Sequence, residues 1–188
     1  MKFVESGLGG LYYIDPTPFK DERGLFARTY CKKLFSEIHF DKEFVQFNYS
    51  FNKQKGTLRG LHFQFAPYGE TKLIRCISGS VYDVAVDLRK GSPSFLQSFG
   101  IELSEQNMRS ILIPEGFAHG FQTLEDNSAL IYHHTEFYNP NYEDGLVYND
   151  PSLKIDWPLP PVNISKKDKD YNLISKNFEA YEVQILQK

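Results

Sequence analysis

Short runs that alternate apolar and polar residues, separated by turn-forming residues, follow one another along most of the chain. Nine of these runs predict β-strands, at residues 11–16, 44–52, 57–64, 71–77, 80–88, 95–103, 110–114, 119–124 and 129–138. So many short strands at this spacing are typical of a β-sandwich or barrel. Gly79 lies between two of the runs and predicts a hairpin turn. A few short peripheral helices complete the all-β picture, one at 32–38 and another after Ser165.

The run at 44–52 has two faces of different character, because successive side chains of a strand point to opposite sides. One face carries Gln46, Asn48 and Ser50, and the other carries Val45, Phe47, Tyr49 and Phe51. Periodicity alone favours a polar face turned to solvent, and the alternative is a polar pocket inside a barrel. The run at 80–88 leaves a similar choice, since Asp83 and Asp87 are either exposed or buried as partners of a histidine.

The composition fits one globular domain. The chain has 188 residues, of which 41% are hydrophobic and 15% aromatic, and this is enough apolar area for a core. We expect a single domain over 1–188, with a barrel at about 44–140 and both terminal segments packed on it. The net charge of −3 and the scattered charges of both signs argue against a nucleic-acid surface.

The cysteines and the apolar runs indicate a cytoplasmic protein. Cys31 and Cys76 are the only cysteines and form no CxxC pair, so we expect reduced thiols and no disulfide framework. No run approaches the ~20 apolar residues that a membrane span needs. The first residues lack the long apolar segment of a signal peptide.

The histidines favour proton transfer over metal binding. A metal-binding barrel would usually offer an HxH pair, but the residues two before and two after His62 are Gly60 and Gln64. His133 and His134 are adjacent, so on a strand they point to opposite faces. These spacings do not favour a metal site, and we interpret His62 as a candidate general base.

A base that removes a proton beside a carbonyl needs a cation for the enolate oxygen and an acid to return the proton. Lys72, alone in an apolar strand, is the candidate cation, although a strand lysine is usually an edge or surface residue. Tyr132 is the candidate acid, although a strand tyrosine usually serves in packing. Arg59 and His62 differ in strand parity, so either Gly60 permits a bulge or Arg59 serves a subunit boundary.

Many ordered segments of the chain carry a resemblance to a known family. They include FKDERGLF, VQFNYS, KGTLRGLHFQ, TKLIRCISGSVYDVAVDLRKGSP, IPEGFAHGF, LIYHHTEFY, IDWP and ISKKD, and they run from about residue 19 to 168. In these segments the chain resembles the dTDP-4-dehydrorhamnose 3,5-epimerases. The resemblance implies a cupin-type jelly-roll barrel, a homodimer, and epimerisation of a nucleotide-linked 4-keto-6-deoxy sugar with no metal and no cofactor.

The same resemblance implies roles for individual residues. His62 matches the family's base, Lys72 the lysine near the enolate, and Tyr132 the general acid. Asp168 in ISKKDKD matches the aspartate that orients the histidine, and Asp170 is the alternative within that segment.

The resemblance also implies a set of residues that bind the nucleotide sugar. These are Arg23 and Arg59 at the phosphates, Gln46 and Asn48 as amide contacts, His119 at the substrate, Lys167 beside Asp168, and Tyr138 stacked on the base, with Phe19 supplied by the neighbouring subunit. The resemblance thus implies that Gln46 and Asn48 face the pocket rather than solvent.

Three positions depart from the family pattern. Arg28 stands where the family often has a nucleotide-binding glutamate, and Phe47 and Tyr49 replace an acid and a histidine of the common QDNHS. The nucleotide carrier therefore stays open. The sequence also leaves room for an epimerase acting at C3 or C5 alone, a 3,4-ketoisomerase, a non-catalytic sugar-nucleotide binding module and a metal-dependent cupin dioxygenase.

Overall fold

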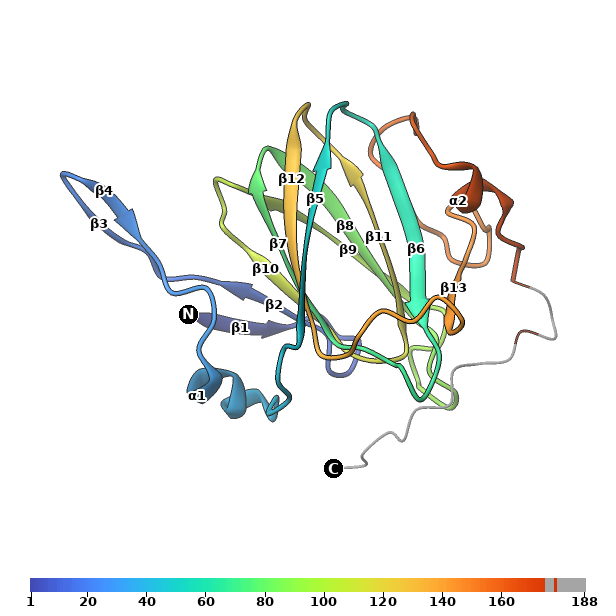
Figure 1. Cartoon of the computed structure of the whole chain (residues 1–188), viewed down its shortest axis with the longest axis horizontal. Coiled ribbons are helices and arrows are strands. Elements are labelled where there is room, and N and C mark those ends of the chain that lie inside the picture. The colour runs from blue at the N-terminus through green and yellow to red at the C-terminus, as the bar shows by residue number, and fades with distance from the viewer. Residues whose placement is uncertain (175–177, 179–188) are drawn as a thin grey trace.

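Two antiparallel sheets face each other and form a barrel in the computed structural model, which describes residues 1–174 and 178 (Figure 1). The strands of the six-stranded sheet are, in spatial order, β1 (Lys2–Glu5), β2 (Tyr12–Asp15), β10 (Ser110–Ile113), β7 (Lys72–Ser78), β12 (Ser128–His134) and β5 (Gln46–Asn52). Those of the five-stranded sheet are β13 (Glu143–Gly145), β6 (Leu58–Gln64), β11 (Phe117–Thr123), β8 (Ser80–Asp87) and β9 (Ser98–Ser104). The predicted all-β jelly-roll class is confirmed.

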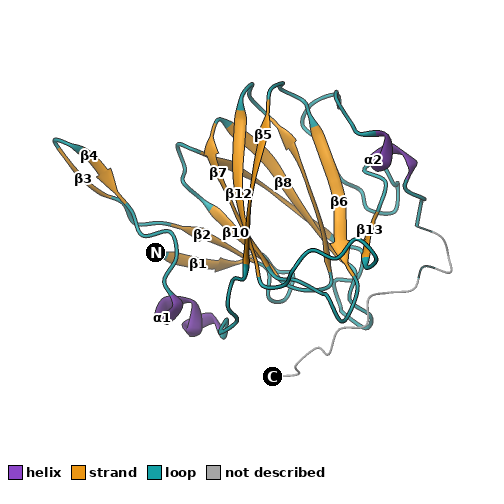
Figure 2. Cartoon of the chain, viewed as in Figure 1, coloured by secondary structure: helices purple, strands orange, loops and turns teal. Residues whose placement is uncertain are grey.

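All nine predicted strand regions contain a strand. The prediction missed β1, β13 and the strands β3 (Phe19–Asp21) and β4 (Gly24–Phe26), which have three or four residues each and therefore show almost no alternation. The helical segment at 32–38 divides into α1 (Lys32–Phe35) and a 3-10 turn (Ser36–Ile38), and α2 (Lys166–Asp170) follows Ser165 (Figure 2). Among the described residues, no helix is long and apolar enough to cross a bilayer.

The core lies between the two sheets. Ile74, Ile111 and Leu130 of the six-stranded sheet pack with Val81 and Phe121 of the five-stranded sheet, and each is at most 2% exposed. Burying one such side chain stabilises the fold by about 1.5–3 kcal/mol. The core thus fixes the distance between the two walls of the barrel.

The hairpin predicted at Gly79 is wrong. β7 and β8 lie in different sheets and do not pair, so Gly79 carries the chain from one wall of the barrel to the other. Its φ is +66°, and a Cβ there would lie 2.6 Å from Oγ of Ser128. Alternation and a turn glycine look the same in a hairpin and in such a corner, so local sequence cannot separate them.

A bulge in β6 places Arg59 and His62 on one face. Arg59 pairs with Phe121 and His62 pairs with His119, so two residues of β6 lie opposite one residue of β11. Gly60 permits this, since its φ is +101° and a Cβ would lie 2.6 Å from the carbonyl oxygen of His119. Arg59 and His62 would face opposite sides of a regular strand, and the sequence left two explanations open. The bulge is one of them.

The β3–β4 hairpin extends away from the sheets (Figure 1). Its strands pair only with each other. Phe19 and Phe26, at its base, are 67% and 73% exposed.

Candidate active site

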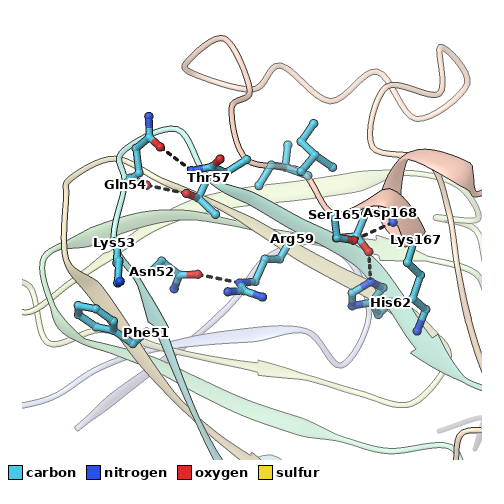
Figure 3. A pocket seen from close by; sticks show the side chains of 13 residues that line it. Phe51, Asn52, Lys53, Gln54, Thr57, Arg59, His62, Ser165, Lys167 and Asp168 are labelled. Atoms are coloured by element: carbon cyan, nitrogen blue, oxygen red, sulfur yellow. Dashed lines mark hydrogen bonds and ion pairs between the residues drawn. The ribbon is translucent and has the colours of Figure 1, made fainter.

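A histidine–carboxylate pair joins β6 to α2. Nε2 of His62 lies 2.7 Å from Oδ1 of Asp168, and Oδ2 accepts a hydrogen bond from the backbone N–H of Gly60 at 3.3 Å (Figure 3). The Ser165 hydroxyl accepts from the backbone N–H of Asp168 at 3.0 Å and caps the short helix, which holds the carboxylate in place. Asp170 is exposed and pairs with Lys166, so Asp168 is the residue that contacts the histidine.

The charge on Asp168 fixes the tautomer of the imidazole. Burial alone would raise the pKa of Asp168, but the contacts with His62 and Gly60 outweigh burial and hold this pKa below its usual value. The carboxylate therefore accepts the Nε2 proton of His62, and the lone pair of the neutral ring lies on Nδ1. A ring in this state can accept a proton from a substrate.

Lys72 is buried and held by two acceptors. It is 8% exposed, and its Nζ donates to the carbonyl oxygen of His62 at 3.4 Å and to Oε1 of Glu70 at 3.1 Å. Burial alone would raise the pKa of Glu70, but Lys72 and His134 lower it to about 2. The carboxylate is thus charged at neutral pH and keeps the ammonium beside His62.

Tyr132 lies on β12, in the wall opposite His62. Its ring contacts those of His119 and His134, with centroid distances of 6.0 and 6.1 Å. Desolvation of the phenol and the nearby charge of Asp83 raise the pKa of Tyr132 well above its ordinary value. The phenol therefore keeps its proton and can donate it.

Two cavities meet at Arg59 and His62. The smaller has a volume of about 280 Å³ and is lined by Lys72, His119 and Tyr132 among others. The larger, of about 620 Å³, extends along β6 to Lys167 and Asp168 (Figure 3). Arg59 lies in both cavities, and its Nε donates to Oδ1 of Asn52 at 2.7 Å. The two spaces together suit a ligand with two unlike parts.

His119 has a buried carboxylate partner of its own. Its Nε2 lies 2.9 Å from Oδ2 of Asp83, and the two side chains are 6% and 0% exposed. Burial lowers the pKa of His119, although Asp83 opposes this shift. Asp83 is therefore the buried histidine partner that its strand pattern allowed. Asp87 instead binds Arg89, together with Ser92 and Ser94.

The amide face of β5 turns toward the smaller cavity. Asn48 lines this cavity, and Gln46 contacts Asn48 and the backbone of Tyr138, which lies at the cavity edge. The solvent-facing orientation favoured by periodicity is wrong, because β5 is an edge strand whose apolar face is the exposed one. Lys167 lines the larger cavity and forms an ion pair with Glu143.

Gln46 lines neither cavity itself, and three further predicted binding residues lie outside both. Phe19 and Arg23 belong to the β3–β4 hairpin, and Arg28 follows it. The Arg23 side chain is 83% exposed and pairs with Asp21. The single chain does not bring these residues to the site.

Sequence reasoning gave no role to Glu70 and His134, which line the smaller cavity. Their signal was weak: Glu70 precedes Lys72 by two residues, and His134 shares a face with Tyr132. Among the residues that the structure describes, no group of three or more His, Cys, Asp or Glu is arranged to hold a metal ion.

Comparisons with known proteins decide the family. A family model described as dTDP-4-dehydrorhamnose 3,5-epimerase matches residues 5–176. The chain belongs to this family. A dTDP-4-dehydrorhamnose 3,5-epimerase of Shigella flexneri is 43% identical over 169 residues, which cover 89% of this chain and 93% of that protein.

Solved structures of this epimerase family share the architecture. One, from Bacillus anthracis with TDP and PPi bound, is 41% identical with a TM-score of 0.89, and the match covers 92% of this chain and 99% of that one. Another, a dTDP-6-deoxy-D-glucose-3,5-epimerase from Legionella pneumophila in complex with dTDP-4-keto-L-rhamnose, is 41% identical with a TM-score of 0.87 and covers 92% of each chain. The epimerase family match spans every residue of the candidate site.

Proposed function

We propose that this protein epimerises a dTDP-linked 4-keto-6-deoxy sugar by removing and returning protons beside the C4 ketone. The observation that carries this proposal is the arrangement around the smaller cavity. His62, paired with Asp168, lies on one wall, and Tyr132 lies on the other, with Lys72 beside them. The family of the chain agrees with this chemistry.

The proposed reaction begins at Nδ1 of His62. The C4 ketone acidifies the C–H bonds at C3 and C5, and Nδ1 takes one of these protons while Asp168 stabilises the imidazolium that forms. The ammonium of Lys72 stabilises the enolate oxygen. Both groups are held in place by contacts with carboxylates, so little rearrangement is needed when charge develops.

Inversion follows from the placement of the acid. His62 belongs to β6 of the five-stranded sheet and Tyr132 to β12 of the six-stranded sheet. A proton removed toward one wall and returned from the other reaches the opposite face of the carbon. One histidine serves both carbons if the sugar turns within the cavity.

The diphosphate is proposed to lie in the larger cavity, and the rest of the nucleotide sugar to reach Tyr138 and the amides of Gln46 and Asn48 at the smaller one. Arg59 and Lys167 contribute positive charge there, which suits a diphosphate. We take dTDP as the carrier because relatives are solved with TDP or a dTDP sugar. A different carrier is the alternative, tested by the same assay with other nucleotides. A cytoplasmic location is part of this proposal, since reduced thiols fit it.

We further propose that the protein works as a homodimer, with a second copy covering the outer face of β5. This face exposes Val45, Phe47, Tyr49 and Phe51 by 45–66%. Such a contiguous apolar surface favours protein–protein contact. Within the described residues, Nε of Arg75 on β7 is buried without a hydrogen-bond partner, and a second copy would supply the acceptor. The β3–β4 hairpin then extends toward the partner with Phe19 and Arg23.

The test is NMR in D2O with dTDP-4-keto-6-deoxyglucose, following deuterium uptake at C3 and C5. The wild-type protein should exchange both positions, and His62→Asn should lose exchange at both while its circular dichroism stays unchanged. Exchange retained in the variant would exclude His62 as the base. Exchange at one carbon would indicate a C3-only or C5-only epimerase, and binding without exchange a non-catalytic module.

A further inference from the structure

Glu70 and His134 have no role in the proposed proton transfers, yet both line the cavity where these would occur. Glu70 lies just before β7 and His134 ends β12, and both side chains are 9% exposed. Oε1 of Glu70 lies 3.1 Å from Nζ of Lys72, and Oε2 lies 2.6 Å from Nδ1 of His134. Glu70 therefore links the ammonium to an imidazole on the neighbouring strand.

The contacts continue from His134 to β5. Nε2 of His134 lies 3.3 Å from Nδ2 of Asn48, and Oδ1 of Asn48 accepts from Nε2 of Gln46 at 3.4 Å. Oε1 of Gln46 accepts from the backbone N–H of Tyr138 at 3.2 Å. We call this chain of hydrogen bonds the relay; its members in order are the Tyr138 N–H, Gln46, Asn48, His134 and Glu70.

The direction of the relay is fixed at both ends. A backbone N–H can only donate, and a charged carboxylate can only accept. The two amides and the imidazole between them could each be reversed by an amide flip or a change of tautomer. Only one arrangement satisfies every contact: each group donates toward Glu70, so His134 carries its proton on Nδ1 and Asn48 turns its NH2 group to the ring.

We propose that Glu70 and His134 are positioning residues that, through the relay, fix the orientation of the ligand-binding amides Gln46 and Asn48. This inference rests on the proposed function, in which these amides bind the nucleotide sugar. In the fixed orientation, each amide keeps one N–H outside the relay. These two donors suit the carbonyl and phosphate oxygens of a nucleotide.

Replacing the carboxylate by an amide creates a conflict. In Glu70→Gln, the oxygen is needed by Lys72, so the new NH2 group faces Nδ1 of His134. The ring must then move its proton to Nε2, Asn48 must flip, and Gln46 must flip in turn. The last flip turns the NH2 group of Gln46 toward the backbone N–H of Tyr138, so that two donors face each other. Whichever group fails to reverse, the relay therefore loses one hydrogen bond.

A second substitution should remove the conflict. In the double variant Glu70→Gln/Asn48→Asp, the carboxylate moves to position 48. It accepts from Nε2 of His134 on one side and from Gln46 on the other, so Gln46 keeps its contact with Tyr138. Every contact is satisfied again, but the proton of the imidazole is now on Nε2.

The experiment combines ¹⁵N NMR of the imidazoles with calorimetric titration of dTDP. We expect an Nδ1–H tautomer for His134 in the wild type, loss of this pure signature in Glu70→Gln, and an Nε2–H tautomer in the double variant. We expect Glu70→Gln to bind dTDP about tenfold more weakly. Glu115→Gln, which changes another lysine-paired carboxylate that lies outside both cavities, is the matched control and should leave both readouts unchanged.

An Nε2–H tautomer in the wild type would overturn the proposal, and so would an unchanged tautomer or an unchanged dTDP affinity in Glu70→Gln. If Glu70→Gln folds poorly, the tautomer of the double variant decides. The tautomers are read without turnover, so a wild type that shows Nδ1–H but no epimerisation would disprove the proposed function and leave the relay standing. A wild type that epimerises the sugar, but whose His134 tautomer stays the same in the variants, would disprove the relay and leave the proposed function standing.

Discussion

Asp168 determines which nitrogen of His62 is available to a substrate. Asp168 is 3% exposed, and its carboxylate accepts from Nε2 of His62 and from the Gly60 N–H at once. The sequence alone could not separate Asp168 from Asp170, because both lie in one run of charged residues. Burial separates them, and a paired substitution can test the difference.

Asp168→Asn should lower kcat by about 10²–10⁴-fold, because an amide can donate to His62 and favour the wrong tautomer. The KM should change little, since Asp168 acts through His62. Steady-state kinetics measure both constants. Asp170→Asn is the control on the same helix, and its exposed side chain predicts wild-type activity. Equal losses in the two variants would contradict the assignment.

Glu70 should make stability depend on pH. Its pKa is lowered from 4.5 to about 2 in the folded protein. A depressed folded-state pKa contributes stability that is present above the unfolded value and lost as pH falls through the folded one. We expect a loss of up to about 3 kcal/mol in the free energy of unfolding between about pH 5 and pH 2. Urea unfolding measures it, and Glu70→Gln should show a smaller loss over the same window.

At the scale of elements, the bulge in β6 brings Arg59 and the proposed base, His62, to one face. Arg59 and His62 would face opposite sides of a regular strand, and the extra residue turns both to the cavities. The bulge depends on Gly60, whose position leaves no room for a side chain. The geometry of the site is therefore sensitive to a residue without functional groups.

Gly60→Ala should destabilise the protein strongly and lower activity. Besides the positive φ, its Cβ would lie 2.6 Å from the carbonyl oxygen of His119 and 2.7 Å from Cα of Gly120. Gly91→Ala is the matched control, because its φ of +76° is also positive but its Cβ would meet nothing within 4 Å. We expect Gly91→Ala to lower the free energy of unfolding by about 1 kcal/mol, and Gly60→Ala to lower it by at least about 2 kcal/mol more. Urea unfolding that gives equal values for the two would contradict the role of close packing.

The elements also show what sequence could and could not predict. Alternation located every strand of seven or eight residues, because a half-buried strand needs that pattern. It could not say which sheet a strand joins, and the hairpin predicted at Gly79 is wrong for that reason. It assigned the wrong side of β5 to solvent, since this depends on what covers the edge strand. Glu70 and His134 escape sequence reasoning because Glu70 contacts His134, far away in the sequence, and His134 contacts Asn48 on another strand.

At the scale of the whole molecule, the β3–β4 hairpin and the aromatic face of β5 support the proposed second copy. The hairpin carries Phe19 and Arg23 away from the cavities of its own chain (Figure 1). Side chains such as Phe47 and Tyr49 stay exposed to solvent among the residues that the structure describes. A dimer in which each hairpin completes the other site would account for both features.

This arrangement predicts complementation between inactive subunits. Arg23→Ala and His62→Asn should each abolish or greatly reduce activity alone. Mixed dimers should recover activity, because one of their two sites would combine an intact His62 with an intact Arg23 from the partner. Subunits are exchanged and activity is assayed, with sedimentation confirming the dimer. No recovery despite exchange would place Arg23 in its own chain's site or outside catalysis.

The proposed base and the proposed acid lie on different sheets, so the gap that a sugar ring would bridge is set by side chains between the sheets. Ile74, Leu130 and Phe121 act as spacers between the two walls. A smaller spacer, as in Leu130→Ala, would let the walls approach or tilt by fractions of an ångström. Stereochemical fidelity in this enzyme would then be a property of its interior packing, and directed evolution toward new sugars would find useful changes far from any ligand.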